Sequence, residues 1–177
     1  MKEKLLQSTA REYSAPQRTV ALFFEGLFFV LLVPFLLARA GRALDRRLHL
    51  PQLPRWGPNL FAALLLGIPG WALAMWSIVA QFRLGRGTPV PLMATQKLVV
   101  EPPYTYSRNP MALGTIFFYL GVGVALGSLG AVGLSLLLAI LLLVYIKQVE
   151  EREMEARFGV EYERYRECTP FLIPYLW

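Results

Sequence analysis

The stretch RNPMALGTIFFYLGVGVALGSLGAVGLSLLLAILLLVYIK, residues 108–147, decides the fold, because no charged side chain lies between its first and last residues. A bilayer core of about 30 Å is crossed by about 20 helical residues, so this run is long enough for two crossings. The segment GSLG at residues 127–130 has the composition of a turn between them. Closing this hairpin brings Arg108 and the acidic pair Glu150 and Glu151 to the same membrane face.

The composition of the whole chain agrees with a membrane protein. Hydrophobic residues make up 55% of it, the mean hydropathy is +0.44 and only 17% of the residues are charged, compared with about 25% in soluble domains. Two further apolar spans are predicted at 19–38 and 56–82. We therefore expect an all-α integral membrane fold of about four transmembrane helices, in a single domain over residues 1–177.

The charged residues predict how the chain is oriented. The two termini and the 83–110 loop carry 13 of the 18 Lys and Arg residues, and the 39–55 loop carries the other five. The positive-inside rule then favours termini and a site on the cytoplasmic side. We separately expect the membrane to be the cytoplasmic membrane of a bacterium or archaeon. The five outward arginines either clamp lipid phosphates at the opposite surface or mark a shallow first hairpin. Anionic headgroups suffice as partners for the net charge of +6, and no nucleic-acid-binding motif is present.

After Ile146 the sequence changes from apolar to strongly charged. Apolar and aromatic residues recur there at helical spacing, namely at Val149, Met154, Phe158, Tyr162 and Tyr165. This periodicity predicts that the last span continues into the cytosol as an amphipathic helix, which Gly159 interrupts.

The polar residues at the borders of the hairpin limit the chemistry. They lack the Ser-His-Asp or Cys-His sets of acyl transfer, and they form no metal-ligand cluster. An arginine and two carboxylates suit a polar, partly cationic cofactor, with Arg108 binding a carboxylate and the Glu pair binding ammonium or hydroxyl groups. Methyl transfer, in which the enzyme mainly aligns donor and acceptor, is compatible with this set of polar residues.

Four segments in this order resemble one enzyme family. They are LVVEPPYTYSRNPMALG at 98–114, Gly121-Val-Gly123, Glu150-Glu151, and FGVEYERY at 158–165 followed by Pro170 and Pro174. Over residues 84–175 the chain resembles the superfamily of isoprenylcysteine carboxyl methyltransferases and phospholipid methyltransferases. The resemblance implies S-adenosylmethionine as the cofactor and no metal. It also implies a membrane-resident acceptor, either a prenylcysteine-type carboxylate or a phospholipid amine.

The resemblance also implies which residues form the site. The cofactor-binding residues are expected to be Tyr104, Arg108, Asn109, Pro110, Met111, Leu113, Gly114, Gly121, Gly123, Glu150 and Glu151. Ala112, Tyr162 and Tyr165 are expected on the acceptor side. Gly121 and Gly123 have an alternative role in close helix packing, and the tyrosines have one as interfacial anchors.

Glu25 is a candidate for a different reason, since it is the one acid inside the first span. An ionisable residue within a membrane span is by default a functional hypothesis. Arg108, Glu151 and Glu25 are therefore the expected catalytic residues, with Glu25 also expected to bind substrate. Pairing of Glu25 with a nearby arginine is the alternative.

Some positions depart from the family pattern. Asn109 stands where many relatives have His, and Ala112 stands where many have Tyr. Asn cannot act as a base, so any proton must go to Glu25, Glu150, Glu151 or water. A function of another class, a non-catalytic membrane scaffold or small-molecule carrier with the family fold, is the alternative, and it would bind no S-adenosylmethionine.

Overall fold

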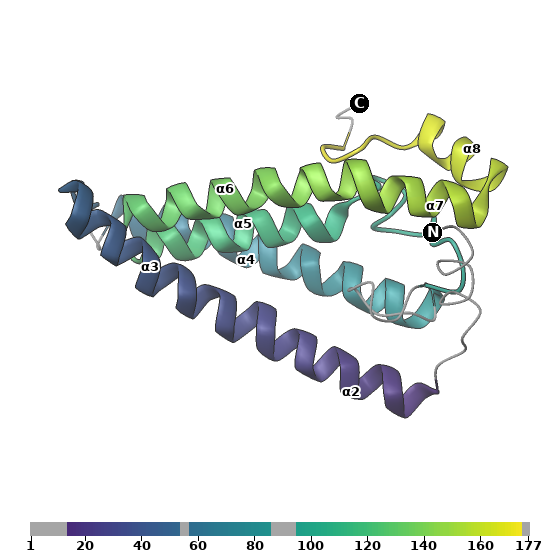
Figure 1. The fold of residues 1–177 in the computed structure, drawn as a ribbon, viewed down its shortest axis with the longest axis horizontal. Coiled ribbons are helices and arrows are strands. Elements are labelled where there is room, and N and C mark those ends of the chain that lie inside the picture. The colour runs from purple at the N-terminus through teal and green to yellow at the C-terminus, as the bar shows by residue number, and fades with distance from the viewer. Residues whose placement is uncertain (1–13, 54–56, 86–94, 175–177) are drawn as a thin grey trace.

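The computed structural model describes residues 14–53, 57–85 and 95–174, and every regular element in these ranges is a helix (Figure 1). Arg55 and Trp56, which belong to the predicted basic loop and the start of the predicted second span, lie outside the described residues.

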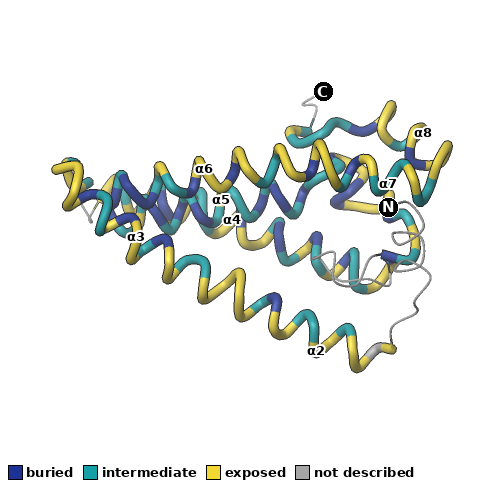
Figure 2. Tube along the Cα trace, in the orientation of Figure 1, coloured by how far each residue is buried: buried dark blue, intermediate teal, exposed yellow. Residues whose placement is uncertain are grey.

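Within the described ranges, three helical stretches are long and apolar enough to cross a bilayer: Pro16–Leu48, Pro58–Gly85 and Leu129–Phe158. A fourth apolar helix, α5 (Pro110–Ala125), has 16 residues, which corresponds to about 24 Å of helix. The expected all-α membrane fold is confirmed, with α5 as its short member. Exposed residues occur along the length of these stretches (Figure 2). Many of them are large and apolar, as expected of an integral membrane protein whose outer faces contact lipid.

The first stretch consists of α2 (Ala15–Gly26), the π-helical segment η1 (Leu27–Leu32) and α3 (Val33–Leu48). Its beginning is fixed by a capping box, in which the backbone N–H of Ser14 donates to Gln17 Oε1 at 3.0 Å. It ends at His49, whose φ of 52° and left-handed conformation close the helix. In Figure 1, α2 diverges from the rest of the molecule while α3 lies against it.

The bundle consists of α4 (Pro58–Ala80), α5 and α6 (Leu129–Tyr145), which lie side by side (Figure 1). Glycines bring α4 and α5 into close contact. A Cβ built on Gly114 would lie 2.6 Å from the backbone N of Ala74, and one on Gly121 would lie 2.7 Å from the Cα of Gly67. No side chain fits at these positions, so the two helices pack backbone to backbone.

The turn of the predicted hairpin lies where the sequence places it. α5 ends at Ala125, α6 begins at Leu129, and Gly127 between them has a φ of 63°. Beyond α6 the chain continues through η4 (Ile146–Glu150) into α7 (Glu151–Phe158), and α8 (Val160–Cys168) follows. Gly159, with a φ of 52°, separates α7 from α8, which confirms the predicted interruption of the tail helix.

The end of α3 is anchored to this turn through the buried carboxylate of Asp45. Ser128 Oγ donates to Asp45 Oδ2 at 2.5 Å, and the backbone N–H of Gly130 donates to Asp45 Oδ1 at 2.6 Å. Ser128 Oγ also accepts from the N–H of Ala131, so it caps α6. The anchor fixes α3 at one end of the molecule, whereas α2 diverges from the bundle at the other (Figure 1).

Candidate active site

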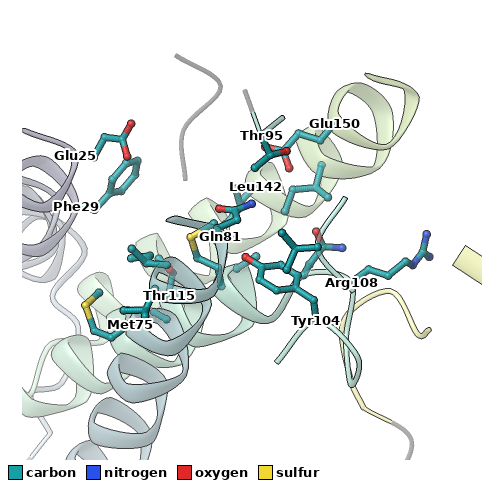
Figure 3. Close-up of a pocket in the computed structure, with 18 of the residues that line it drawn as sticks. Glu25, Phe29, Met75, Gln81, Thr95, Tyr104, Arg108, Thr115, Leu142 and Glu150 are labelled. Atoms are coloured by element: carbon teal, nitrogen blue, oxygen red, sulfur yellow. The ribbon is translucent and has the colours of Figure 1, made fainter. Parts of the chain in front are cut away.

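A cavity of about 520 Å³ lies at the end of the bundle that carries α7 and α8. Every described helical element except α3 contributes to its lining, including the π-helical segment η2 (Gln81–Gly85) that follows α4, and so does the segment before α5. Figure 3 shows Glu25 and Phe29 on one side, Tyr104, Arg108 and Glu150 on the other, and Gln81 between them. One cavity thus joins the apolar helices to the polar borders of the hairpin.

A buried ion pair connects these borders. Arg108 Nη1 lies 2.6 Å from Glu151 Oε1, and the two side chains are only 8% and 7% exposed. Lys147 Nζ, one helical turn before Glu151, lies 2.8 Å from its other oxygen. Hairpin closure produces this contact as the sequence predicts, because Arg108 precedes α5 and Glu151 begins α7. Each carboxylate oxygen of Glu151 thus contacts one cation, and the two contacts fix the orientation of this side chain.

The C-terminal segment after α8 holds the loop that carries Arg108. The backbone N–H of Arg108 donates to Pro170 O at 2.9 Å, and Asn109 Nδ2 donates to Phe171 O at 2.8 Å. The guanidinium carbon of Arg108 also lies 5.7 Å from the ring centre of Phe171. Asn109 therefore acts here as a donor that ties two segments together, in agreement with its inability to act as a base.

Three tyrosines line the cavity from the polar side. The Tyr165 hydroxyl donates to the backbone oxygen of Tyr104 at 2.7 Å, and the Tyr104 hydroxyl donates to Ser77 O at 3.4 Å. Burial raises the pKa of Tyr104, Tyr162 and Tyr165 above the ordinary phenol value. For Tyr162, the neighbouring Glu151 raises the pKa further and Arg108 opposes that shift. All three phenols therefore stay neutral at physiological pH and act as hydrogen-bond donors.

The structure brings many of the predicted site residues to this cavity. Its lining includes Glu25, Tyr104, Arg108, Asn109, Met111, Ala112, Glu150, Glu151, Tyr162 and Tyr165. Glu25 reaches it from α2 and is 7% exposed. Their roles toward cofactor and acceptor stay predictions.

The other predicted site residues lie outside the described lining of the cavity. Pro110 is the buried first residue of α5, and Leu113 lies half-buried one turn further along. Gly114 and Gly121 pack against α4, and a Cβ on Gly123 would lie 3.0 Å from the N of Val132 on α6. These contacts correspond to the packing alternative for Gly121 and Gly123. A cofactor role for these glycines stays a prediction.

Sequence reasoning missed several residues of the lining. Ala74, Met75, Ile78 and Gln81 of the second span belong to it, as do Thr95 and Arg157. The apolar residues among them give no signal, because they resemble the residues of any membrane span. Gln81 did offer a signal in the sequence, since it is an amide at the end of an uncharged run. Its Oε1 is buried and has no hydrogen-bond partner among the described residues.

A family model for phospholipid methyltransferases matches residues 59–161, more than half of the chain. Searches of curated proteins and of solved structures give no match. The matched range covers α4, α5, α6 and the ion pair between Arg108 and Glu151. It confirms the family membership that the motifs predict, and it includes nearly all of α4, which lies outside the range 84–175 of the sequence resemblance. The chain belongs to the phospholipid methyltransferase family.

Proposed function

We propose that this protein transfers a methyl group from S-adenosylmethionine to the amine of a membrane-resident phospholipid. Membership of a methyltransferase family supports the reaction class. The observation that carries the proposal is the shared cavity, which extends from the Arg108–Glu151 ion pair to Glu25 and Phe29 of the outer helix. Its volume of about 520 Å³ is typical of small-molecule sites.

The polar end of the cavity fits the functional groups of the cofactor. Arg108 offers a guanidinium group for a carboxylate, and Glu150 and Glu151 offer carboxylates for ammonium or ribose hydroxyl groups. The buried Arg108 Nε and Gln81 Oε1 have no hydrogen-bond partner among the described residues. Buried polar atoms are normally paired, so this donor and this acceptor are suited to a ligand. When bound, the cofactor supplies an electrophilic methyl group.

The chain's own residues would align the reactants and exclude water. Arg108 is held by Glu151, by Phe171 and by the backbone of Pro170, so its guanidinium is oriented before any ligand binds. The neutral phenols of Tyr104, Tyr162 and Tyr165 border the same space. Such preorganisation matters in methyl transfer, because correct alignment alone lowers the barrier by about 7–11 kcal/mol.

The acceptor end of the cavity favours an amine over a carboxylate. Glu25 is the buried acid there, on the helix that diverges from the bundle. A carboxylate acceptor would have to bind beside Glu25, whereas an ammonium group is stabilised by it. An ammonium group must lose a proton before it can attack a methyl group, and in this proposal Glu25 accepts that proton. The neighbouring Leu22, Phe29 and Val30 provide apolar contacts for lipid tails.

The proposed orientation places this polar end at the cytoplasmic surface, where the cofactor is dissolved. The excess of Lys and Arg at the termini and in the 83–110 loop supports this orientation.

Incubation of the purified protein with methyl-labelled S-adenosylmethionine and total membrane lipid, followed by identification of the labelled product, tests the proposal. We expect the label on the headgroup nitrogen of a phospholipid. Label on a carboxylate, recovered as a base-labile methyl ester, would contradict the amine assignment. Binding of neither the cofactor nor its demethylated product would identify a scaffold or carrier instead.

A further inference from the structure

The last turns of α3 lie at the end of the molecule opposite α7 and α8 (Figure 1). They carry a group of arginines that the proposed reaction does not use. Arg39, Arg42 and Arg46 are exposed and lie at positions i, i+3 and i+7 of α3. This spacing places them on one face of the helix, along about 10 Å of its axis. We call these three residues the α3 arginine face.

Contacts on the opposite side of α3 determine where the α3 arginine face points and where it lies along the bundle. The buried residues of α3 are Leu37, Gly41 and Asp45. A Cβ on Gly41 would lie 2.6 Å from Ala131, and Asp45 accepts hydrogen bonds from Ser128 and Gly130. Because α3 packs on the bundle through these residues, the α3 arginine face points away from it. It lies at the level of the α5–α6 turn, where an apolar hairpin reaches the membrane surface.

The described residues leave the charges of this face without an ion-pair partner. In the described part of the chain, none of its three guanidinium groups forms an ion pair, and the nearby Asp45 is buried in its contacts with Ser128 and Gly130. Cations in the last turn of a helix are favourable for the helix dipole, which explains Arg46 and its neighbour Arg47. Arg39 and Arg42 lie before that turn and need another explanation.

We propose that the α3 arginine face is a binding site for the phosphate of an anionic phospholipid in the surrounding leaflet. Guanidinium groups bind phosphate oxygens in a bidentate geometry and are more weakly hydrated than ammonium groups. A side chain that points away from the protein at the membrane surface contacts lipid headgroups. The positive-inside rule disfavours arginines on the surface opposite the cavity. Anionic lipid bound at this site would neutralise their charge.

Native mass spectrometry of the full chain, released from nanodiscs of phosphatidylcholine with phosphatidylglycerol, tests this site. We expect phosphatidylglycerol to stay bound to the wild type. The combined Arg39→Gln, Arg42→Gln and Arg46→Gln variant should bind it about a hundredfold more weakly, roughly fivefold for each cation removed near an anionic surface. The matched control combines Arg83→Gln, Arg152→Gln and Arg164→Gln, which removes the same charge at exposed positions elsewhere and should bind like the wild type.

Equal binding of phosphatidylglycerol by the wild type and the α3 variant would overturn the site, as would an equal loss in the control. Inorganic phosphate at the same concentration should not displace the lipid, and displacement would identify a site for soluble anions instead. The combined Arg39→Lys, Arg42→Lys and Arg46→Lys variant keeps the charge and controls for a folding defect. It should bind phosphatidylglycerol more weakly than the wild type, and equal affinity would exclude bidentate recognition.

Discussion

At the scale of single residues, Arg108 combines a structural contact with a proposed binding role. Its guanidinium is buried against Glu151 and Phe171, yet its Nε has no hydrogen-bond partner among the described residues. Lysine keeps the charge but cannot grip a carboxylate in two places. We expect Arg108→Lys to lower kcat/KM tenfold or more while circular dichroism shows an unchanged helix content. The exposed Arg152→Lys is the control, and full activity of Arg108→Lys would reduce Arg108 to a packing and topology residue.

Glu25 gives a second prediction at this scale, because it lies on the opposite side of the cavity from Arg108 and Glu150 (Figure 3). Glu25→Gln keeps the shape of the side chain and removes its ability to accept a proton. We expect transfer to an amine acceptor to fall about a hundredfold, the usual contribution of a general base, while the affinity for S-adenosylmethionine stays within twofold. Measured turnover and affinity separate the two effects. Loss of cofactor affinity would place Glu25 in the cofactor site, and unchanged turnover would leave it structural.

At the scale of elements, the contact between α4 and α5 depends on residues without side chains. A Cβ on Gly114 would lie 2.6 Å from the backbone of Ala74, whereas one on Gly133 meets nothing within 4 Å. Gly114→Val should force the helices apart and lower the midpoint of thermal unfolding in detergent by several degrees, since overpacking costs about 1–3 kcal/mol. Gly133→Ala should keep or raise that midpoint, because alanine favours a helix. Equal midpoints for Gly114→Val and the wild type would contradict backbone-to-backbone packing.

The hairpin could be predicted from the sequence, whereas the packing of α3 and the part of α4 in the cavity could not. The charge-free run, its Gly127 turn and its charged borders predicted the hairpin and the meeting of Arg108 with Glu151, because these features are continuous in the chain. The contact of Asp45 with Ser128 could not be predicted, since it depends on how α3 packs against a helix more than 80 residues away. The part of α4 in the cavity was missed for the same reason, because apolar residues look alike whether they contact lipid, protein or a ligand.

At the scale of the whole molecule, the divergence of α2 from the bundle predicts how the acceptor reaches the cavity (Figure 1). The cavity is lined on that side by Leu22, Phe29 and Val30, so a lipid tail can remain in the bilayer while its headgroup enters. Each buried methylene contributes about 0.8 kcal/mol, and this remote binding energy positions the head. We expect kcat/KM to rise with tail length at constant headgroup. Equal values for short-tailed and long-tailed acceptors would mean that the site opens to water.

We propose that closing the hairpin builds the cofactor site beside the ion pair of Arg108 and Glu151. Calorimetric titration of S-adenosylmethionine, or of its demethylated product, into the purified protein tests it most directly. We predict that Glu151→Ala weakens binding roughly tenfold or more, because loss of one charge-assisted hydrogen bond costs about 1.5–3 kcal/mol. The exposed Glu161→Ala on α8 is the matched control and should bind like the wild type. Unchanged affinity in a folded Glu151→Ala variant would contradict this location of the cofactor.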